Sequence, residues 1–123
     1  SLRATVPAKH HRVTRGDDYR HIVRKGNRVG GAFCITHAVL HASTEQPARF
    51  GFIVSKAVGN AVTRNLVRRR LKSIVELRLA QGFVGADVVF RALPQSAHAP
   101  FELLESETNR ALDRVEGTRA DAK

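Results

Sequence analysis

The 123-residue chain is predicted to be a single α+β domain spanning residues 1–123. Apolar residues make up 42% of the sequence, which is enough for one modest core in a chain of this length. Segments with apolar residues at helical spacing alternate with segments of strand periodicity, in the order helix, strands, helix, strand, helix. A small α/β sandwich is the alternative arrangement of the same elements.

The N-terminal region is predicted to be a basic arm followed by a short helix. Residues 1–16 carry four Lys or Arg residues and no acid, so we expect a mobile or extended arm. Asp17 is placed to cap the helix, and Gly26 is placed to end it in the left-handed conformation. Between them Tyr19, Ile22 and Val23 have the spacing of one apolar helix face.

Three strands are predicted, of which the first two are close in sequence. Phe33 to His41 and Arg49 to Ser55 both alternate between two faces, as a strand requires. Because residues 42–48 form only a short polar link, we expect these two strands to pair antiparallel. The third strand is predicted from Asp87 to Arg91. One face of the first strand carries Phe33, Ile35, His37, Val39 and His41.

Two longer helices complete the predicted fold. Asn60 is expected to cap the first, which ends near Leu79 or Ala80. The second is predicted from Phe101 to Val115, with acids early and arginines late, as suits the helix dipole. Residues 116–123 are expected to be a frayed tail. The inward positions of the last helix are Phe101, Leu104, Thr108, Ala111, Leu112 and Val115.

The charge of the chain indicates a polyanionic partner. Twenty-one Lys and Arg face 11 Asp and Glu, which gives a formal net charge of +10. Nucleic acid is the first candidate, an anionic membrane surface the second, and a basic globule without such a partner the third. No apolar run approaches the roughly 20 residues of a membrane span, and no secretory signal is evident. With Cys34 as the only cysteine, a cytoplasmic location is expected.

The positive charge is concentrated in one window of the sequence. Between Glu45 and Glu76 there is no acidic residue, whereas most protein surfaces mix the two signs. The window therefore departs from ordinary surface composition. Its seven basic residues are Arg49, Lys56, Arg64, Arg68, Arg69, Arg70 and Lys72.

A helical wheel sorts the window into two flanks. At 100° per residue, five polar residues fall within one arc of roughly 140°, and most of the remainder is apolar. Phosphates relieve the repulsion between like charges on such a ridge, and Arg grips their oxygens with two parallel hydrogen bonds. Arg70 lies apart, at the edge of the apolar flank. The polar arc holds Arg64, Asn65, Arg68, Arg69 and Lys72, and the apolar flank holds Val62, Leu66, Val67, Leu71, Ile74 and Leu77.

Several other functions are disfavoured by the sequence. His37 and His41 share a strand face, but no zinc-ligand spacing surrounds them, so no metal site is expected. The acids are explained by helix ends, and no self-sufficient nuclease arrangement is present. A DNA-binding role lacks a helix-turn-helix pattern. Composition alone leaves open a structural RNA-binding protein of a ribosomal or assembly type.

The segment from Lys56 to Arg69, KAVGNAVTRNLVRR, resembles the signature of the bacterial ribonuclease P protein family. That signature reads Val-Gly-Asn-Ala-Val, one variable residue, Arg-Asn, two variable residues, a basic residue and Arg. The resemblance implies an α+β sandwich of αβββαβα order, of the ribosomal-protein-S5-domain-2-like type. It also implies a single sheet of about four strands with a left-handed βαβ crossover. The fourth strand is expected to be short, around Arg28 to Gly30.

The resemblance also implies a function. In the family an RNA subunit cleaves precursor tRNA with Mg²⁺ held mainly by RNA and substrate, and the protein assists without catalytic residues of its own. The partners expected here are therefore the catalytic RNA and the 5′ leader of precursor tRNA, with no membrane. The residues expected to contact the catalytic RNA are Asn60, Arg64, Asn65, Arg68, Arg69 and Lys72.

The leader is expected in a cleft between the first helix and the sheet, where aromatic rings and basic groups suit single-stranded RNA. Phe50 and Phe52 are further candidates, although core packing is the favoured interpretation for both. Val23 and His37 stand where relatives often carry aromatic residues. The residues expected to bind the leader are Tyr19, Phe33, His37 and Lys56.

Overall fold

The structure is a computed structural model that describes residues 11–121 of the chain. In these residues three α-helices, four strands and a short 3₁₀ helix follow one another in an α+β arrangement. The fourth, short strand that the family resemblance implied is present one residue before its expected position. In chain order the elements are α1 (Gly16–Lys25), β1 (Asn27–Val29), β2 (Cys34–Leu40), β3 (Arg49–Ile53), α2 (Ala61–Ala80), β4 (Ala86–Ala92), η2 (Pro94–His98) and α3 (Phe101–Asp121).

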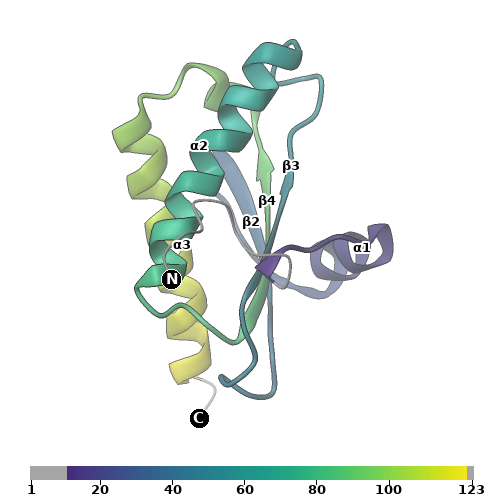
Figure 1. The fold of residues 1–123 in the computed structure, drawn as a ribbon, viewed down its shortest axis with the longest axis vertical. Coiled ribbons are helices and arrows are strands. Elements are labelled where there is room, and N and C mark those ends of the chain that lie inside the picture. The colour runs from purple at the N-terminus through teal and green to yellow at the C-terminus, as the bar shows by residue number, and fades with distance from the viewer. Residues whose placement is uncertain (1–10, 122–123) are drawn as a thin grey trace.

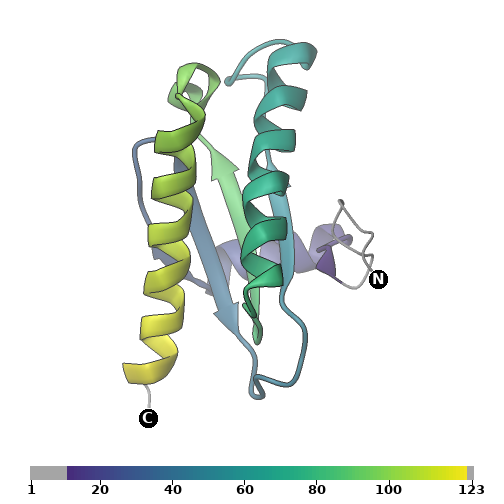
Figure 2. The same ribbon diagram turned by 60° about the vertical axis from the view of Figure 1, so that its left-hand side comes forward.

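The molecule has three layers, with one sheet in the middle. Helices α2 and α3 lie side by side over one face of the sheet, and α1 lies against the other face (Figure 1). In the second view α3 covers the side of β2, whereas α2 covers the side of β3 (Figure 2). The sheet therefore has two different outer edges, one beneath each long helix.

The strand order is β1-β2-β4-β3, so β4 lies between the two strands predicted to pair with each other. The expected antiparallel pairing of β2 with β3 is wrong: β2 pairs antiparallel with β4, and β3 pairs parallel with it. With α2 in front and both parallel strands pointing up, β4 lies to the left of β3 (Figure 2). The crossover is therefore left-handed, as the family resemblance implied and against the general preference.

Two clusters of apolar side chains hold the layers together. The larger lies between the sheet and the two long helices, where Phe50, Phe90, Leu71 and Leu104 are fully buried. Phe50 and Phe52 both stack on Phe90 in this layer, where Phe50 is fully buried and Phe52 is half-buried. The smaller cluster lies beneath α1 and contains Val13, Ile22 and Val89, with Tyr19 and Val23 packed against it.

The ends of α1 and α3 differ from the predicted ones. Asp17 does not cap α1; the capping position is Arg15, which makes no side-chain cap, and Asp17 instead pairs with Arg20 one turn on. Gly26 has φ of −77°, so it does not end α1 in the left-handed conformation. Glycine is needed there because a Cβ would lie 2.7 Å from the carbonyl oxygen of Ala38. Helix α3 continues through residues 116–121, where a frayed tail was expected.

The described part of the N-terminal arm is bound to the sheet. Residues 1–10 lie outside the described residues. Arg12 forms a parallel bridge with Phe50, and the Val13 amide donates to the Phe50 carbonyl oxygen over 2.9 Å. Because Val13 is also buried, this stretch is anchored along the outer edge of β3, so of the two expected forms of the arm the extended one is present here.

Candidate nucleic-acid interface

The approach to α2 fixes the start of the basic helix. The Asn60 side chain accepts a hydrogen bond from the Thr63 amide over 2.9 Å, as predicted for a capping residue. Gly59 has φ of +156°, and a Cβ there would lie 3.0 Å from the Thr63 side chain. The Arg64 Nε donates to the Gly59 carbonyl oxygen over 3.1 Å, so this arginine is partly occupied by the turn that precedes it.

Beyond this first turn, α2 presents a ridge of cationic side chains to solvent. The Arg68 Nη1 donates to Asn65 Oδ1 over 2.9 Å, which aligns the two side chains. Among residues 11–118, whose side chains the structure describes, no carboxylate lies within 4.0 Å of the charged nitrogens of Arg64, Arg68, Arg69 or Lys72. We call the following set the α2 ridge, since it lines one shallow groove of about 560 Å³: Val62, Asn65, Arg68, Arg69 and Lys72.

The exposure of Val62 and Leu77 corrects the predicted apolar flank. Val62 is 78% exposed and Leu77 is 54% exposed. Arg69 is seven positions after Val62, so the two lie only about 20° apart around the helix. Leu77 is likewise seven positions after Arg70 and lies about 20° from it around the helix. The Arg70 Nη1 donates to the Ala99 carbonyl oxygen beside this flank. The buried face of α2 is consequently narrower than the sequence suggested.

A second pocket joins the α2 ridge to α1. It has a volume of about 210 Å³ and lies at the outer edge of β3, where the segment before α1 passes. Tyr19 lines it from α1, and Arg68 and Lys72 line it from α2. The sequence suggested two separate surfaces for these residues, whereas the fold brings them to one cavity, here called the α1–α2 pocket. Phe50 and Phe52, the further leader candidates, line it as well. The remaining lining residues, which were not predicted, are Arg12, Val13 and Thr14.

Tyr19 is held in this pocket by close contact with the sheet. A Cβ at Gly51 would lie 2.6 Å from the Tyr19 ring, so the ring packs directly on the strand backbone. The Phe52 amide donates to the Tyr19 hydroxyl over 3.3 Å. The ring is therefore fixed in orientation before any ligand arrives.

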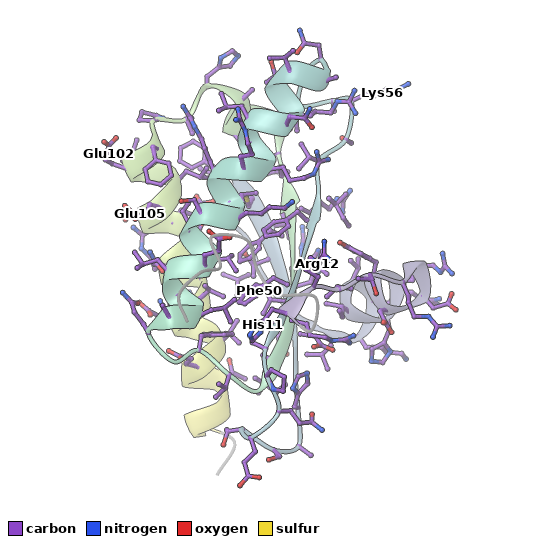
Figure 3. All side chains as sticks on the ribbon, viewed as in Figure 1. His11, Arg12, Phe50, Lys56, Glu102 and Glu105 are labelled. Atoms are coloured by element: carbon purple, nitrogen blue, oxygen red, sulfur yellow. The ribbon has the colours of Figure 1, made fainter. Side chains whose placement is uncertain are left out.

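The other three predicted leader residues lie elsewhere. Phe33 precedes β2 and packs against the cluster beneath α2 and α3, so it does not share a face with Tyr19. Its amide is bound by the Glu107 carboxylate of α3. Lys56 is exposed beside the N-terminal end of α2, away from Arg12 and Phe50 (Figure 3).

His37 is only 4% exposed, and neither of its ring nitrogens has a hydrogen-bond partner. Burial, together with the nearby cations of Arg28 and Arg91, lowers the pKa of His37 below its ordinary value. Arg28 lies opposite His37 on β1, and Arg91 lies two residues beyond its partner on β4, so both were invisible to sequence reasoning. Arg28 and Arg91 place positive charge around His37 on the face of the sheet that α1 covers.

No group of three or more potential metal ligands occurs within the described residues. Nor does this part of the chain contain a helix long and apolar enough to cross a membrane. The α2 ridge and the α1–α2 pocket offer cations to anionic groups, and the pocket also offers aromatic rings.

Comparison with known sequences decides the family. A sequence model of the family described as ribonuclease P matches residues 8–116. The chain is 44% identical over 108 residues to the ribonuclease P protein component of Clavibacter michiganensis subsp. michiganensis, covering 88% of this chain and 95% of the relative. It is 38% identical over 125 residues to that of Salinispora tropica, covering 88% and 92%.

The chain belongs to the ribonuclease P protein family. It is a protein subunit of the ribonuclease P holoenzyme, and its fold is that of solved ribonuclease P proteins. The Staphylococcus aureus protein superposes with a TM-score of 0.76 at 21% identity, over 87% of this chain and 96% of the other. The Thermotoga maritima protein superposes with a TM-score of 0.74 at 18% identity, over 84% and 96%.

In this ribonuclease P protein, α1 is attached to the sheet by a chain of charged groups. Asp18 of α1 lies 3.5 Å from Arg49 Nη1, and Arg49 binds Asp87 of β4 through two hydrogen bonds of 2.9 and 2.7 Å. His41 Nε2 lies 2.8 Å from Asp87 Oδ1. These contacts hold α1, and with it Tyr19, at a fixed position on the sheet.

Proposed function

We propose that this protein binds the catalytic RNA of ribonuclease P through the α2 ridge and helps it remove 5′ leaders from precursor tRNA. The observation that carries the proposal is a row of cations on one flank of α2 with no intramolecular carboxylate within the described residues to neutralise them. Such a row repels itself until phosphates approach, and each phosphate bound then releases counterions from the RNA. Asn60 belongs to this surface by fixing the helix that carries it.

The α1–α2 pocket is proposed to receive the single-stranded 5′ leader. Tyr19 offers an aromatic face in a fixed orientation, and stacking on such a ring is tolerant of base identity. Arg12, Arg68 and Lys72 supply positive charge for the phosphates on either side. Because Arg68 and Lys72 line both grooves, leader and catalytic RNA would meet along one continuous surface.

Cleavage itself is assigned to the RNA subunit, with Mg²⁺ held mainly by RNA and substrate. The protein would stabilise the active RNA when Mg²⁺ is scarce, because its cations offset the same phosphate repulsion that the metal ions offset. The proposal gives no direct leader contact to His37, Phe33 or Lys56, because these residues do not line the α1–α2 pocket. We propose the cytoplasm as the location, where precursor tRNA is processed.

The α2 ridge is tested by binding to the cognate catalytic RNA. Arg68→Ala with Arg69→Ala is expected to weaken binding and to reduce the slope of log affinity against log salt by about 0.7–0.9 for each phosphate that the variant no longer neutralises. The matched control is Arg24→Ala with Lys25→Ala, which removes the same charge from the exposed end of α1. Equal effects of the two double variants would show that only net charge matters.

The accessory role is tested by reconstituted cleavage. The protein alone is expected to leave precursor tRNA intact, and to raise its cleavage at low Mg²⁺ once the cognate RNA is added. Tyr19→Ala should weaken binding of leader-bearing precursor about tenfold or more, since one base–aromatic stack contributes about 1–3 kcal/mol. Its affinity for mature tRNA, which has no leader, should not change. Cleavage by protein alone, or equal loss on both RNAs, contradicts the proposal.

A further inference from the structure

A cavity that the proposed function leaves unused lies at the opposite edge of the sheet. It has a volume of about 380 Å³ and opens between α3 and the connection from β1 to β2. The α2 ridge lies beyond β3, at one end of the strand order, whereas this cavity lies beside β1, at the other end. Cavities of about 300–1,000 Å³ are the usual size for small organic ligands. We call it the α3–β1 pocket.

One wall of the α3–β1 pocket is rigidly built. The Glu107 carboxylate accepts hydrogen bonds from three successive amides, those of Ala32, Phe33 and Cys34, at 2.7 to 3.3 Å. Gly31 permits this approach, since a Cβ there would lie 2.5 Å from the Glu107 carboxyl carbon. Both oxygens of the Glu107 carboxylate are thus occupied by backbone amides. Glu107 therefore fixes the connection from β1 to β2 and does not form ion pairs with the described arginines of α3.

Polar groups of the pocket remain available to a ligand. Thr108 is 2% exposed, and its Oγ1 has no hydrogen-bond partner although a buried hydroxyl normally has one. Thr36, also buried, lines the same cavity from β2. A hydroxyl both donates and accepts, so two of them can match the mixed donors and acceptors at the edge of a nucleobase.

Two arginines stand on adjacent turns of α3 at this cavity. Arg110 and Arg114 are four residues apart and share one helix flank, where like charges repel each other. Neither forms an ion pair within the part of the chain that the structure describes. A phosphate between them would relieve that repulsion and could accept paired hydrogen bonds from either guanidinium. Val29 and Ala111 add apolar surface for a planar ring.

We propose that the α3–β1 pocket binds a nucleoside 5′-monophosphate, either free or as one unit of an RNA strand. The phosphate lies on Arg110 and Arg114, and the base enters the cavity to meet the hydroxyls of Thr108 and Thr36. This site is separate from the α2 ridge and does not depend on the function proposed for it. If the nucleotide belongs to RNA, the protein holds two RNA segments at opposite edges of its sheet.

The test is titration of the full chain with adenosine and uridine 5′-monophosphates, with inorganic phosphate, and with a single-stranded RNA oligonucleotide. Arg110→Ala with Arg114→Ala is expected to weaken nucleotide binding at least about tenfold, because the charge-assisted hydrogen bonds of two guanidinium groups are removed. Thr108→Val keeps the shape of the side chain, removes the hydroxyl, and should weaken nucleotide binding while leaving phosphate binding unchanged. The matched control is Arg24→Ala with Lys25→Ala, which removes the same charge from the exposed end of α1, outside this pocket and outside the α2 ridge, and should leave mononucleotide binding intact.

The outcomes separate the two sources of the ligand. Oligonucleotide binding that exceeds mononucleotide binding and is weakened in the α3 variants identifies an RNA unit, whereas equal binding of the two identifies a free nucleotide. Thermal melting of each variant establishes that it is folded. The proposal is overturned if phosphate binds as tightly as the nucleotides, or if folded α3 variants bind every probe as the parent does. Failure of the α2 ridge variants to affect catalytic RNA would bear only on the function proposed above.

Discussion

At the scale of single residues, Asp87 connects three parts of the molecule. Its carboxylate binds Arg49 of β3 through two hydrogen bonds and also meets His41, while Arg49 reaches Asp18 of α1. Burial alone would raise the pKa of Asp87, but the hydrogen bonds from Arg49 and His41 outweigh it and lower that pKa below its ordinary value. The charged form is therefore the one that the fold stabilises.

This shift predicts how stability depends on pH. A carboxyl whose pKa is depressed on folding contributes stability above its unfolded pKa of about 3.9, and that contribution is lost as pH falls through the lower folded value. Asp87→Asn should lower the free energy of unfolding at pH 7 by about 2 kcal/mol, less than for a fully buried pair because Arg49 is partly exposed. Urea unfolding should show that the difference in unfolding free energy between Asp87→Asn and the parent becomes smaller below pH 4.

The control for this measurement is Asp17→Asn, which removes a carboxylate from an exposed pair on α1. Exposed pairs contribute about 0–1 kcal/mol, so this variant should unfold almost as the parent does. If the unfolding free energies of Asp87→Asn and the parent differ by the same amount at pH 7 and pH 3, the charge of Asp87 does not contribute to stability.

At the scale of elements, those with a local signal could be predicted and the pairing of strands could not. Helix α2 begins after Asn60 and ends at Ala80 as expected, because capping and apolar spacing act within one turn or two. Sequence proximity suggested that β2 pairs with β3, yet β4 separates them. The signal that was overlooked is the run Val88, Val89 and Phe90, buried on both faces as a central strand requires.

In the candidate site, too, features with a local sequence signal could be predicted and contacts between distant elements could not. The ridge of α2 could be predicted because the positions on one helix flank follow from helical spacing alone. The meeting of Tyr19 with Arg68 could not, because it requires α1, β3 and α2 to assemble first. Phe33 was placed on the wrong face because it lies just outside β2, where strand alternation no longer applies.

A prediction about α2 concerns its first turn. Asn60→Ala removes the acceptor for the Thr63 amide and should lower the free energy of unfolding by about 1 kcal/mol. Asn65→Ala is the matched control, because Asn65 is exposed on the same helix and caps nothing. Chemical denaturation should therefore rank the two variants clearly. Equal unfolding free energies would mean that the cap does not stabilise α2.

At the scale of the whole molecule, the net charge of +10 sets how the fold responds to salt. Salt weakens both the few ion pairs and the much more numerous repulsions, and with 21 bases against 11 acids the repulsions dominate. The screening length falls from about 30 Å at 0.01 M to about 8 Å at 0.15 M ionic strength. The melting temperature should therefore rise over this range.

The same experiment on Arg68→Ala with Arg69→Ala should show a smaller rise, because two neighbouring cations of the crowded α2 ridge are absent. Differential scanning calorimetry in sodium chloride measures both. Arg78 of α2 pairs with Asp113 and Glu116 of α3 at 2.7 and 2.8 Å. A melting temperature that falls with salt would show that such attractive pairs outweigh the repulsion.

The central place of β4 also has a consequence for biosynthesis. Since β4 is the last strand made and fits between β2 and β3, the sheet cannot close until residue 92 has left the ribosome. Until then the nascent chain carries two strands whose inner edges await the same partner. Every residue up to Ala92 must emerge before either of these edges is satisfied, so the sheet is completed in one late step.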